Sequence, residues 1–169
     1  MRHIVSVLVQ DNPGVLQRIS GLIARRGFNI ESLAVGTTHQ PGLSRISLVV
    51  RGDDRELEQV EKQLNRLIEV IKVTDHYEPH VERELALVKV NVAGMEERLE
   101  VKDIAEAFRA RIVDVAKKSI IFELTGASSK VDDFIHAMKP YGLLEVMRSG
   151  AIALTRGEQV LKVREKKAG

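Results

Sequence analysis

The segment Asp-Asn-Pro-Gly-Val-Leu at residues 11–16 has the residue types to bind the charged groups of a small molecule. The first turn of a helix carries backbone N–H groups without partners inside the helix, and the helix dipole favours an anion there. Gly14 has no side chain, so a carboxylate can approach the N–H groups of Gly14, Val15 and Leu16. The pattern predicts a carboxylate receptor, although a well-capped helix start without a ligand explains the same residues.

A second segment, Arg-Gly-Phe-Asn-Ile at residues 26–30, ends that helix and opens the next strand. Asn29 offers an amide oxygen to an ammonium group, and the carboxylate of Asp11 would add negative charge for the same purpose. Together the two segments predict a site for a small molecule with both a carboxylate and an ammonium group.

Other chemistry has little support in the sequence. The chain has no cysteine, which excludes disulfides, thiolate metal sites and cysteine nucleophiles. The serines sit in no Gly-x-Ser-x-Gly motif, and residues 126–130 lack the spaced glycines of a phosphate-binding loop, so a helix cap is the better interpretation there. Pro79 argues against a helix shared by His76 and His80, which we expect at the surface. We predict no catalytic and no metal-binding residues.

The composition predicts a cytoplasmic globular protein. Hydrophobic residues make up 44% and charged residues 30%, and no apolar run reaches the roughly 18 residues of a membrane span. The N-terminus shows no signal peptide. The net charge is only +2, and acidic and basic residues alternate without the basic stripe of a nucleic-acid binder. We therefore expect neither a nucleic-acid nor a membrane partner.

The first half of the chain predicts the elements that hold the two segments. Asn12 is a good helix N-cap, Pro13 fits the first helical position, and Gly27 ends the helix. Asp53 and Glu56 predict a capping box at the start of a second helix. The expected strands cover residues 3–10, 28–35, 43–50 and 67–73, with a turn at 39–42. The order is strand-helix-strand-strand-helix-strand, as in ferredoxin-like folds.

The second half repeats this order. Its expected strands cover residues 85–92, 112–116, 120–124, 143–146 and 151–154. The inward faces of its helices are Val101, Ile104, Ala105 and Phe108, and then Val131, Phe134, Ile135 and Met138 after a Ser129 cap. The prediction is an α+β chain with two ferredoxin-like (βαββαβ) domains, residues 1–76 and 84–169, joined by a linker at 77–83.

The strand at 43–50 predicts an association between chains. Ile46, Leu48 and Val50 lie on one side of it, while Leu43 and Val49 lie on the other. Both sheet faces are thus partly apolar, and domains of about 80 residues gain stability from pairing. We therefore expect a homodimer.

The residues also resemble a known family. The segment at 11–16 after a strand, followed by Arg-Gly-Phe-Asn-Ile-Glu-Ser-Leu at 26–33, resembles the ACT domain. More narrowly, the chain resembles the small regulatory subunits of acetolactate (acetohydroxyacid) synthase. The supporting stretches are 26–35, 43–45, 57–64, 80–85, 87–90 and 148–150, so the resemblance covers nearly the whole chain.

This resemblance implies a function. Such subunits dimerise through their ACT domains, bind valine, leucine or isoleucine at the interface, and activate and feedback-inhibit a separate catalytic subunit. They bind no cofactor themselves, since thiamine diphosphate, Mg²⁺ and FAD belong to the catalytic subunit. The implied effector contacts are Asp11, Asn12, Gly14, Val15 and Leu16, with Asn29 and Ile30 from the partner chain.

Two residues depart from the family pattern, and two other functions stay open. Asp11 stands where the family often has Asn, and Ala34 replaces a commoner Thr. One alternative is a stand-alone ACT-domain regulator of another metabolic enzyme or of transcription, which would need an output domain that the short linker does not provide. The other alternative, an enzyme in its own right, finds no acid–base pair, metal cluster or nucleophile in its support.

Overall fold

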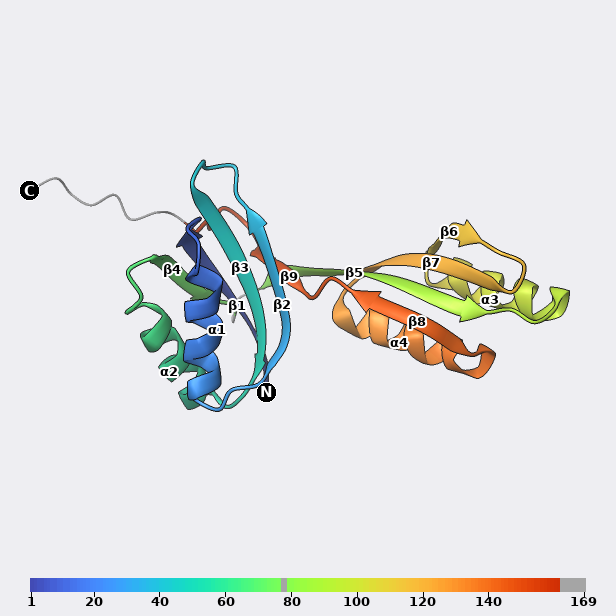
Figure 1. Ribbon diagram of the computed structural model, residues 1–169, viewed down its shortest axis with the longest axis horizontal. Coiled ribbons are helices and arrows are strands. Elements are labelled where there is room, and N and C mark those ends of the chain that lie inside the picture. Colours follow the sequence, from blue (N-terminus) through green and yellow to red (C-terminus); the bar gives the residue numbers. More distant parts are fainter. Residues whose placement is uncertain (77–78, 162–169) are drawn as a thin grey trace, which may run out of the picture. The chain divides into compact units, whose positions relative to one another are not determined.

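Two antiparallel sheets, each accompanied by a pair of helices, make up the computed structural model of the chain (Figure 1). The structure describes residues 1–76 and 79–161. It divides into an N-terminal unit, residues 1–81 together with 151–169, and a C-terminal unit, residues 82–150. The two units are described separately below.

The N-terminal unit has the predicted order of elements. They are β1 (Arg2–Gln10), α1 (Val15–Arg25), β2 (Ile30–Thr37), β3 (Leu43–Arg51), α2 (Asp54–Leu64) and β4 (Val70–Asp75). The strands lie in the order β2-β3-β1-β4, and all their pairings are antiparallel. The predicted ferredoxin-like α+β fold is therefore confirmed for this half of the chain.

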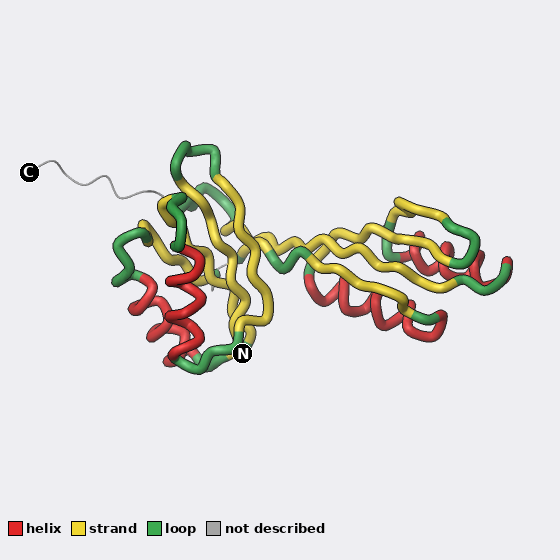
Figure 2. Tube along the Cα trace, in the orientation of Figure 1, coloured by secondary structure: helices red, strands yellow, loops and turns green. Residues whose placement is uncertain are grey.

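The core of the N-terminal unit lies between its sheet and its helices. Figure 2 shows both helices on one side of the sheet. Alternate residues of β1 and β3 point to that side, because successive side chains of a strand face opposite ways. The fully buried members are Val5, Val7, Val9, Ile46, Leu48 and Val50 from the sheet and Val15, Ile19, Ile23, Leu57, Val60 and Leu64 from the helices. The aliphatic periodicity of the sequence thus places α1 and α2.

The other face of this sheet is partly covered by the chain itself. The short strand β9 (Ile152–Thr155) and the residue before it belong to the N-terminal unit. Ala151 and Ala153 form a buried cluster with Ile4 and Val49, and the Ser47 hydroxyl donates to the carbonyl of Ala151 at 2.7 Å. The apolar residues of this face predict contact with a partner chain. In the structure, Ile4 and Val49 instead contact residues of the same chain.

The C-terminal unit repeats the topology. Its elements are β5 (His80–Asn91), α3 (Met95–Ala107), β6 (Arg111–Val115), β7 (Ser119–Gly126), α4 (Ser128–Met138), a 3₁₀ turn (Lys139–Tyr141) and β8 (Leu143–Arg148). The order β6-β7-β5-β8 again places the second, third, first and fourth strands side by side. The ring of Phe134 packs edge-on against Phe108 and Phe122, with centroids 5.4 and 5.9 Å away. The second predicted ferredoxin-like fold is confirmed.

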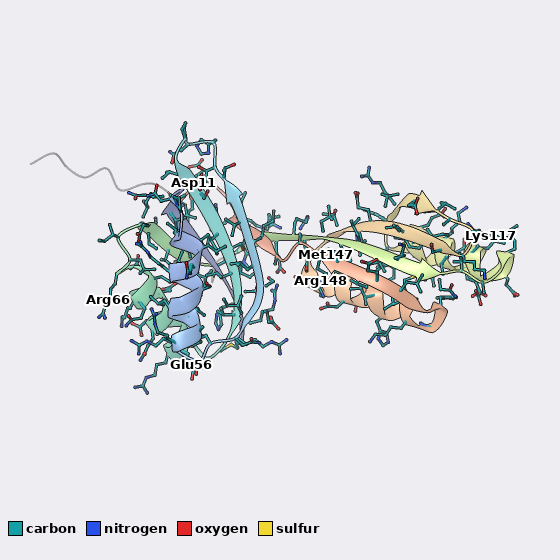
Figure 3. All side chains as sticks on the ribbon, viewed as in Figure 1. Asp11, Glu56, Arg66, Lys117, Met147 and Arg148 are labelled. Atoms are coloured by element: carbon teal, nitrogen blue, oxygen red, sulfur yellow. The ribbon has the colours of Figure 1, made fainter. Side chains whose placement is uncertain are left out.

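A charged cluster joins three elements of the C-terminal unit. Arg148, at the end of β8 and labelled in Figure 3, donates to both carboxylate oxygens of Glu84 on β5, at 2.8 and 2.7 Å. It also donates to Asp132 on α4 at 2.6 Å. These hydrogen bonds raise the pKa of Arg148, which stays charged at every ordinary pH. Glu84 is buried, so Arg148 supplies charge where water is excluded.

Four local predictions differ from the structure. α1 has Gly14 as its N-cap instead of Asn12, and α4 has Ala127 in place of Ser129. β5 begins at His80, inside the predicted 77–83 linker, of which residues 77 and 78 lie outside the described part. The predicted second domain ran to residue 169, whereas the compact C-terminal unit ends at Gly150. The next strand, β9, pairs with β5, and Ala151 and Ala153 pack against Ile4 and Val49 of the first sheet.

Candidate effector site

The turn between β1 and α1 is built by Pro13 and Gly14. Gly14 adopts φ +84°, a left-handed conformation that glycine reaches without strain, and the helix begins at Val15. Asn12 accepts from the Val15 N–H at 3.4 Å through its carbonyl, and its amide donates to the Gln10 side chain at 3.2 Å. Its side chain therefore does not cap the helix, which corrects the predicted role of Asn12.

The absence of a side-chain cap leaves backbone donors open. Within the described residues, the N–H groups of Gly14, Leu16 and Gln17 donate to no protein acceptor, whereas that of Val15 is used by Asn12. The predicted donors were Gly14, Val15 and Leu16, so Val15 drops out and Gln17 enters. The signal for this shift was the Pro-Gly pair, which favours a turn before the helix starts.

The surroundings of these donors are accessible. Asp11, Asn12 and Gly14 are exposed, and Leu16 is 41% exposed. A Cβ added to Gly14 would meet no atom within 4 Å. Val15 points into the core, so it can offer only its backbone. The turn thus presents an open, unblocked helix N-terminus, and Figure 3 shows Asp11 at one end of the N-terminal unit.

Asn29 and Ile30 lie at the far end of α1 from this turn. α1 has 11 residues, which corresponds to roughly 16 Å at 1.5 Å per residue. Figure 1 shows the loops before and after α1 at its opposite ends. Asn29 is exposed, whereas Ile30 is partly buried against the core. Within one chain, therefore, the structure does not bring the two groups of predicted contacts together.

A buried polar network on the other face of the sheet escaped the sequence reasoning. His76 is buried, contrary to the expected surface position, and its Nε2 lies 2.8 Å from the Ser6 hydroxyl. Arg45 donates to the same hydroxyl at 3.0 Å and to the carbonyl of Ala153 at 3.1 Å. Burial, with help from the Arg45 and His80 charges, lowers the pKa of His76 to about 4. The ring is therefore neutral at neutral pH.

The part of the chain that the structure describes has neither a metal-binding cluster nor a membrane-spanning helix. No group of three or more His, Asp or Glu side chains there could hold a metal ion. Among the same residues, no helix is both long and apolar enough to cross a membrane.

Comparison with known proteins decides the family. A family model described as the small subunit-like ACT domain of AHAS matches residues 5–72, and one described as the small subunit of acetolactate synthase matches residues 83–157. A probable acetolactate synthase small subunit from Archaeoglobus fulgidus is 53% identical, over 94% of this chain and 99% of the relative. The chain belongs to the acetolactate synthase small-subunit family. Another such relative, from Methanothermobacter thermautotrophicus, is 48% identical over 94% of this chain and 95% of the relative.

A solved structure agrees with this family membership. The crystal structure of the acetolactate synthase small subunit from Thermotoga maritima superposes with a TM-score of 0.85 at 44% identity, covering 94% of this chain and 99% of the other. The family resemblance and the ACT fold expected from the sequence are thus confirmed. The C-terminal family match extends beyond the C-terminal unit to residue 157, so it includes β9.

Proposed function

We propose that this chain is the regulatory subunit of an acetolactate synthase holoenzyme. It binds a separate catalytic subunit, raises the activity of that subunit and makes it sensitive to valine or to the related leucine and isoleucine. Family membership over nearly the whole chain supports the assembly. Thiamine diphosphate, Mg²⁺ and FAD are assigned to the catalytic subunit, and no catalytic role is assigned to this chain.

The observation that carries the effector role is the uncapped start of α1. Three N–H groups, those of Gly14, Leu16 and Gln17, are open at the end of the helix where the dipole favours an anion, and nothing covers the Gly14 Cα. The carboxylate of an amino acid satisfies these donors. Its aliphatic side chain packs against the exposed part of Leu16, and the predicted contribution of the Val15 side chain falls away because that side chain is in the core.

The second half of the site comes from a second chain. The ammonium group needs the Asn29 amide oxygen, and Ile30 adds apolar surface, yet both lie at the other end of α1 in the same protomer. Two chains related by a two-fold axis would each supply one half to each of two sites. We therefore propose a homodimer through the ACT domains, with the effector at the interface.

Feedback inhibition then follows from linkage. If the amino acid binds one arrangement of the dimer more tightly, it shifts the equilibrium by that difference in affinity and no more. Couplings of this kind are typically about 1–3 kcal/mol, or roughly 5- to 150-fold in affinity. The catalytic subunit senses the arrangement that valine favours.

The test measures acetolactate formation by the catalytic subunit of the same organism, with and without this chain and with and without valine. We expect this chain to raise the rate and valine to lower it only when the chain is present. Gly14→Asp should keep the activation and lose the valine response. The proposal fails if the chain neither co-elutes with the catalytic subunit nor changes its rate, or if the chain alone forms acetolactate.

A further inference from the structure

A hollow of about 1110 Å³ opens on the N-terminal unit, and no residue of the turn before α1 lines it. Leu8 and Arg45 line it and lie opposite each other in the β1–β3 register, on the sheet face that does not carry the helices. Leu154, Thr155 and Val160 from the end of the chain form its other side. Its volume is slightly above the roughly 300–1,000 Å³ of ligand pockets, so it has room for more than an amino acid.

The hollow contains a charge without a counter-ion. Among its described lining residues none is acidic, and in the described part of the chain no carboxylate pairs with Arg45. Arg45 is half-buried, and both hydrogen bonds that it makes come from Nη2. Its Nε and Nη1 protons donate to no described residue. A guanidinium that is partly desolvated and unpaired is stabilised by an anion that it can hold bidentately.

The same network that buries Arg45 fixes its position. Ser6 accepts from Arg45 and contacts His76, whose Nδ1 lies 3.4 Å from the Thr155 hydroxyl. Arg45 and Thr155, on two sides of the hollow, are thus tied to one buried chain of hydrogen bonds. Since His76 is neutral near pH 7, the positive charge of this network rests on Arg45. A pre-positioned cation loses little entropy when it binds an anion.

We propose that this hollow binds an organic anion whose carboxylate or phosphate group pairs with Arg45 and whose apolar part packs against Leu8, Leu154 and Val160. The site is separate from the effector turn, since no residue from Asp11 to Gln17 lines the hollow. It would give the regulatory subunit a second small-molecule input, from a metabolite that is anionic but needs no ammonium group.

The test uses three probes with one apolar chain and different head groups: hexanoate, hexyl phosphate and neutral hexanamide. Calorimetry on the full chain should show saturable binding of at least one of the two anions, at least about tenfold tighter than hexanamide. The anion that binds more tightly identifies the head group. No saturable binding of either anion, or equal affinity for hexanamide, would overturn the proposal.

Variants locate the binding. Leu154→Asp places a carboxylate in the hollow from a residue that is 61% exposed, so the fold should persist and anion affinity should fall at least about tenfold. Ile152→Asp is the matched control, since Ile152 is on the same strand, is 57% exposed and does not line the hollow. Arg45→Gln should also abolish binding. If Arg45→Gln unfolds, the result for Leu154→Asp decides whether the hollow is the binding site.

A last variant separates this site from the effector turn, because a carboxylate probe can bind there too. Gly14→Asp should leave hexanoate and hexyl phosphate affinity unchanged. The assignment is contradicted if anion affinity is unchanged in Leu154→Asp, or if it falls as far in Ile152→Asp as in Leu154→Asp. It is also contradicted if anion affinity falls in Gly14→Asp alone. These measurements need no catalytic subunit, so their failure is distinguishable from a failure of the regulatory function.

Discussion

The imidazole of His76 and the hydroxyl of Ser6 meet at 2.8 Å although 70 residues separate them in the chain. The contact joins β1 to the residue that follows β4, on the sheet face that carries no helix. Arg45 and Thr155 extend it on either side. A polar layer therefore lies between the ACT sheet and the end of the chain, on the face opposite the aliphatic core that the helices cover.

Acid should weaken the N-terminal unit through His76. Its pKa is about 4 in the folded chain, against an ordinary 6.5, so the unfolded chain binds the proton first as pH falls. The free energy of unfolding should therefore decrease from about pH 6.5 to pH 4 and level off below, by up to about 3 kcal/mol. Urea unfolding across this pH range measures the change.

Substitution separates the contribution of His76 to the acid sensitivity of folding from that of Asp and Glu side chains, which also titrate in acid. In His76→Gln this component of the acid sensitivity should disappear, while His136→Gln, on an exposed helix position, should keep it. A His76→Gln profile that runs parallel to the unmodified one from pH 6.5 to pH 4 would contradict the assigned cause.

A negative charge at Gly14 should abolish effector binding. Gly14→Asp places a carboxylate beside the open N–H groups that the ligand carboxylate is proposed to occupy, and we expect valine affinity to fall at least about tenfold. Gly14→Asn is the isosteric neutral control. Both residues pay a similar strain at φ +84°, which Asn and Asp tolerate best after glycine. Calorimetry with valine compares the two.

The pair of variants gives three readable outcomes. Weak binding in Gly14→Asp alone supports the electrostatic role of the turn. Equal loss in both variants would show that bulk rather than charge matters, and unchanged affinity in both would remove the turn from the site.

Removing Arg148 should loosen the C-terminal unit. Arg148→Met withdraws two hydrogen bonds from the buried carboxylate of Glu84 and one from Asp132. Breaking a buried ion pair typically costs 3–5 kcal/mol, and because Arg148 is partly exposed we expect about 2 kcal/mol. Arg111→Met, at an exposed pair with Glu123, should cost under about 1 kcal/mol. Hydrogen exchange of β7 amides measures the loss of stability in both variants. Equal losses would contradict the larger role assigned to Arg148.

The capping box of α2 should contribute about 1 kcal/mol. The Asp53 carboxylate accepts from the Glu56 N–H at 2.7 Å, and the Glu56 carboxylate accepts from the Asp53 N–H at 2.8 Å. Asp53→Ala loses the first bond and should lower the free energy of unfolding by about 1 kcal/mol, whereas Asp53→Asn, also a good cap, should change it by a few tenths. Urea denaturation of the two variants separates them, and equal losses would argue against the cap.

The sequence predicted the features that depend on residues close together in the chain, such as the capping box and the order of helices and strands. The Asp53–Glu56 box is confirmed because its partners lie three residues apart and both bonds form within one turn. The element order is confirmed because aliphatic periodicity is strong in both halves. The helix starts at Asn12 and Ser129 were wrong because a capping side chain was present in the sequence while the backbone turned at a later or earlier residue.

Non-local arrangements were out of reach of the sequence. Nothing near His76 shows that Ser6 will be its neighbour, so a buried histidine was expected at the surface. The sequence likewise did not predict that Ala151 and Ala153 cover Ile4 and Val49, since alanines give a weak apolar signal. At the start of α1 the open N–H groups are those of Gly14, Leu16 and Gln17, and their binding of an effector stays a prediction. The distance of Asn29 from this turn follows only from the length of α1.

The position of β9 has a consequence for the order in which the protein can fold during synthesis. The C-terminal unit, residues 82–150, is an insertion between the first 81 residues and the strand that completes their sheet surface. A ribosome must therefore release the whole inserted unit before Ala151 and Ala153 can cover Ile4 and Val49. Until then the nascent ACT domain carries an exposed apolar patch, and a chain ending at residue 76 would retain it permanently.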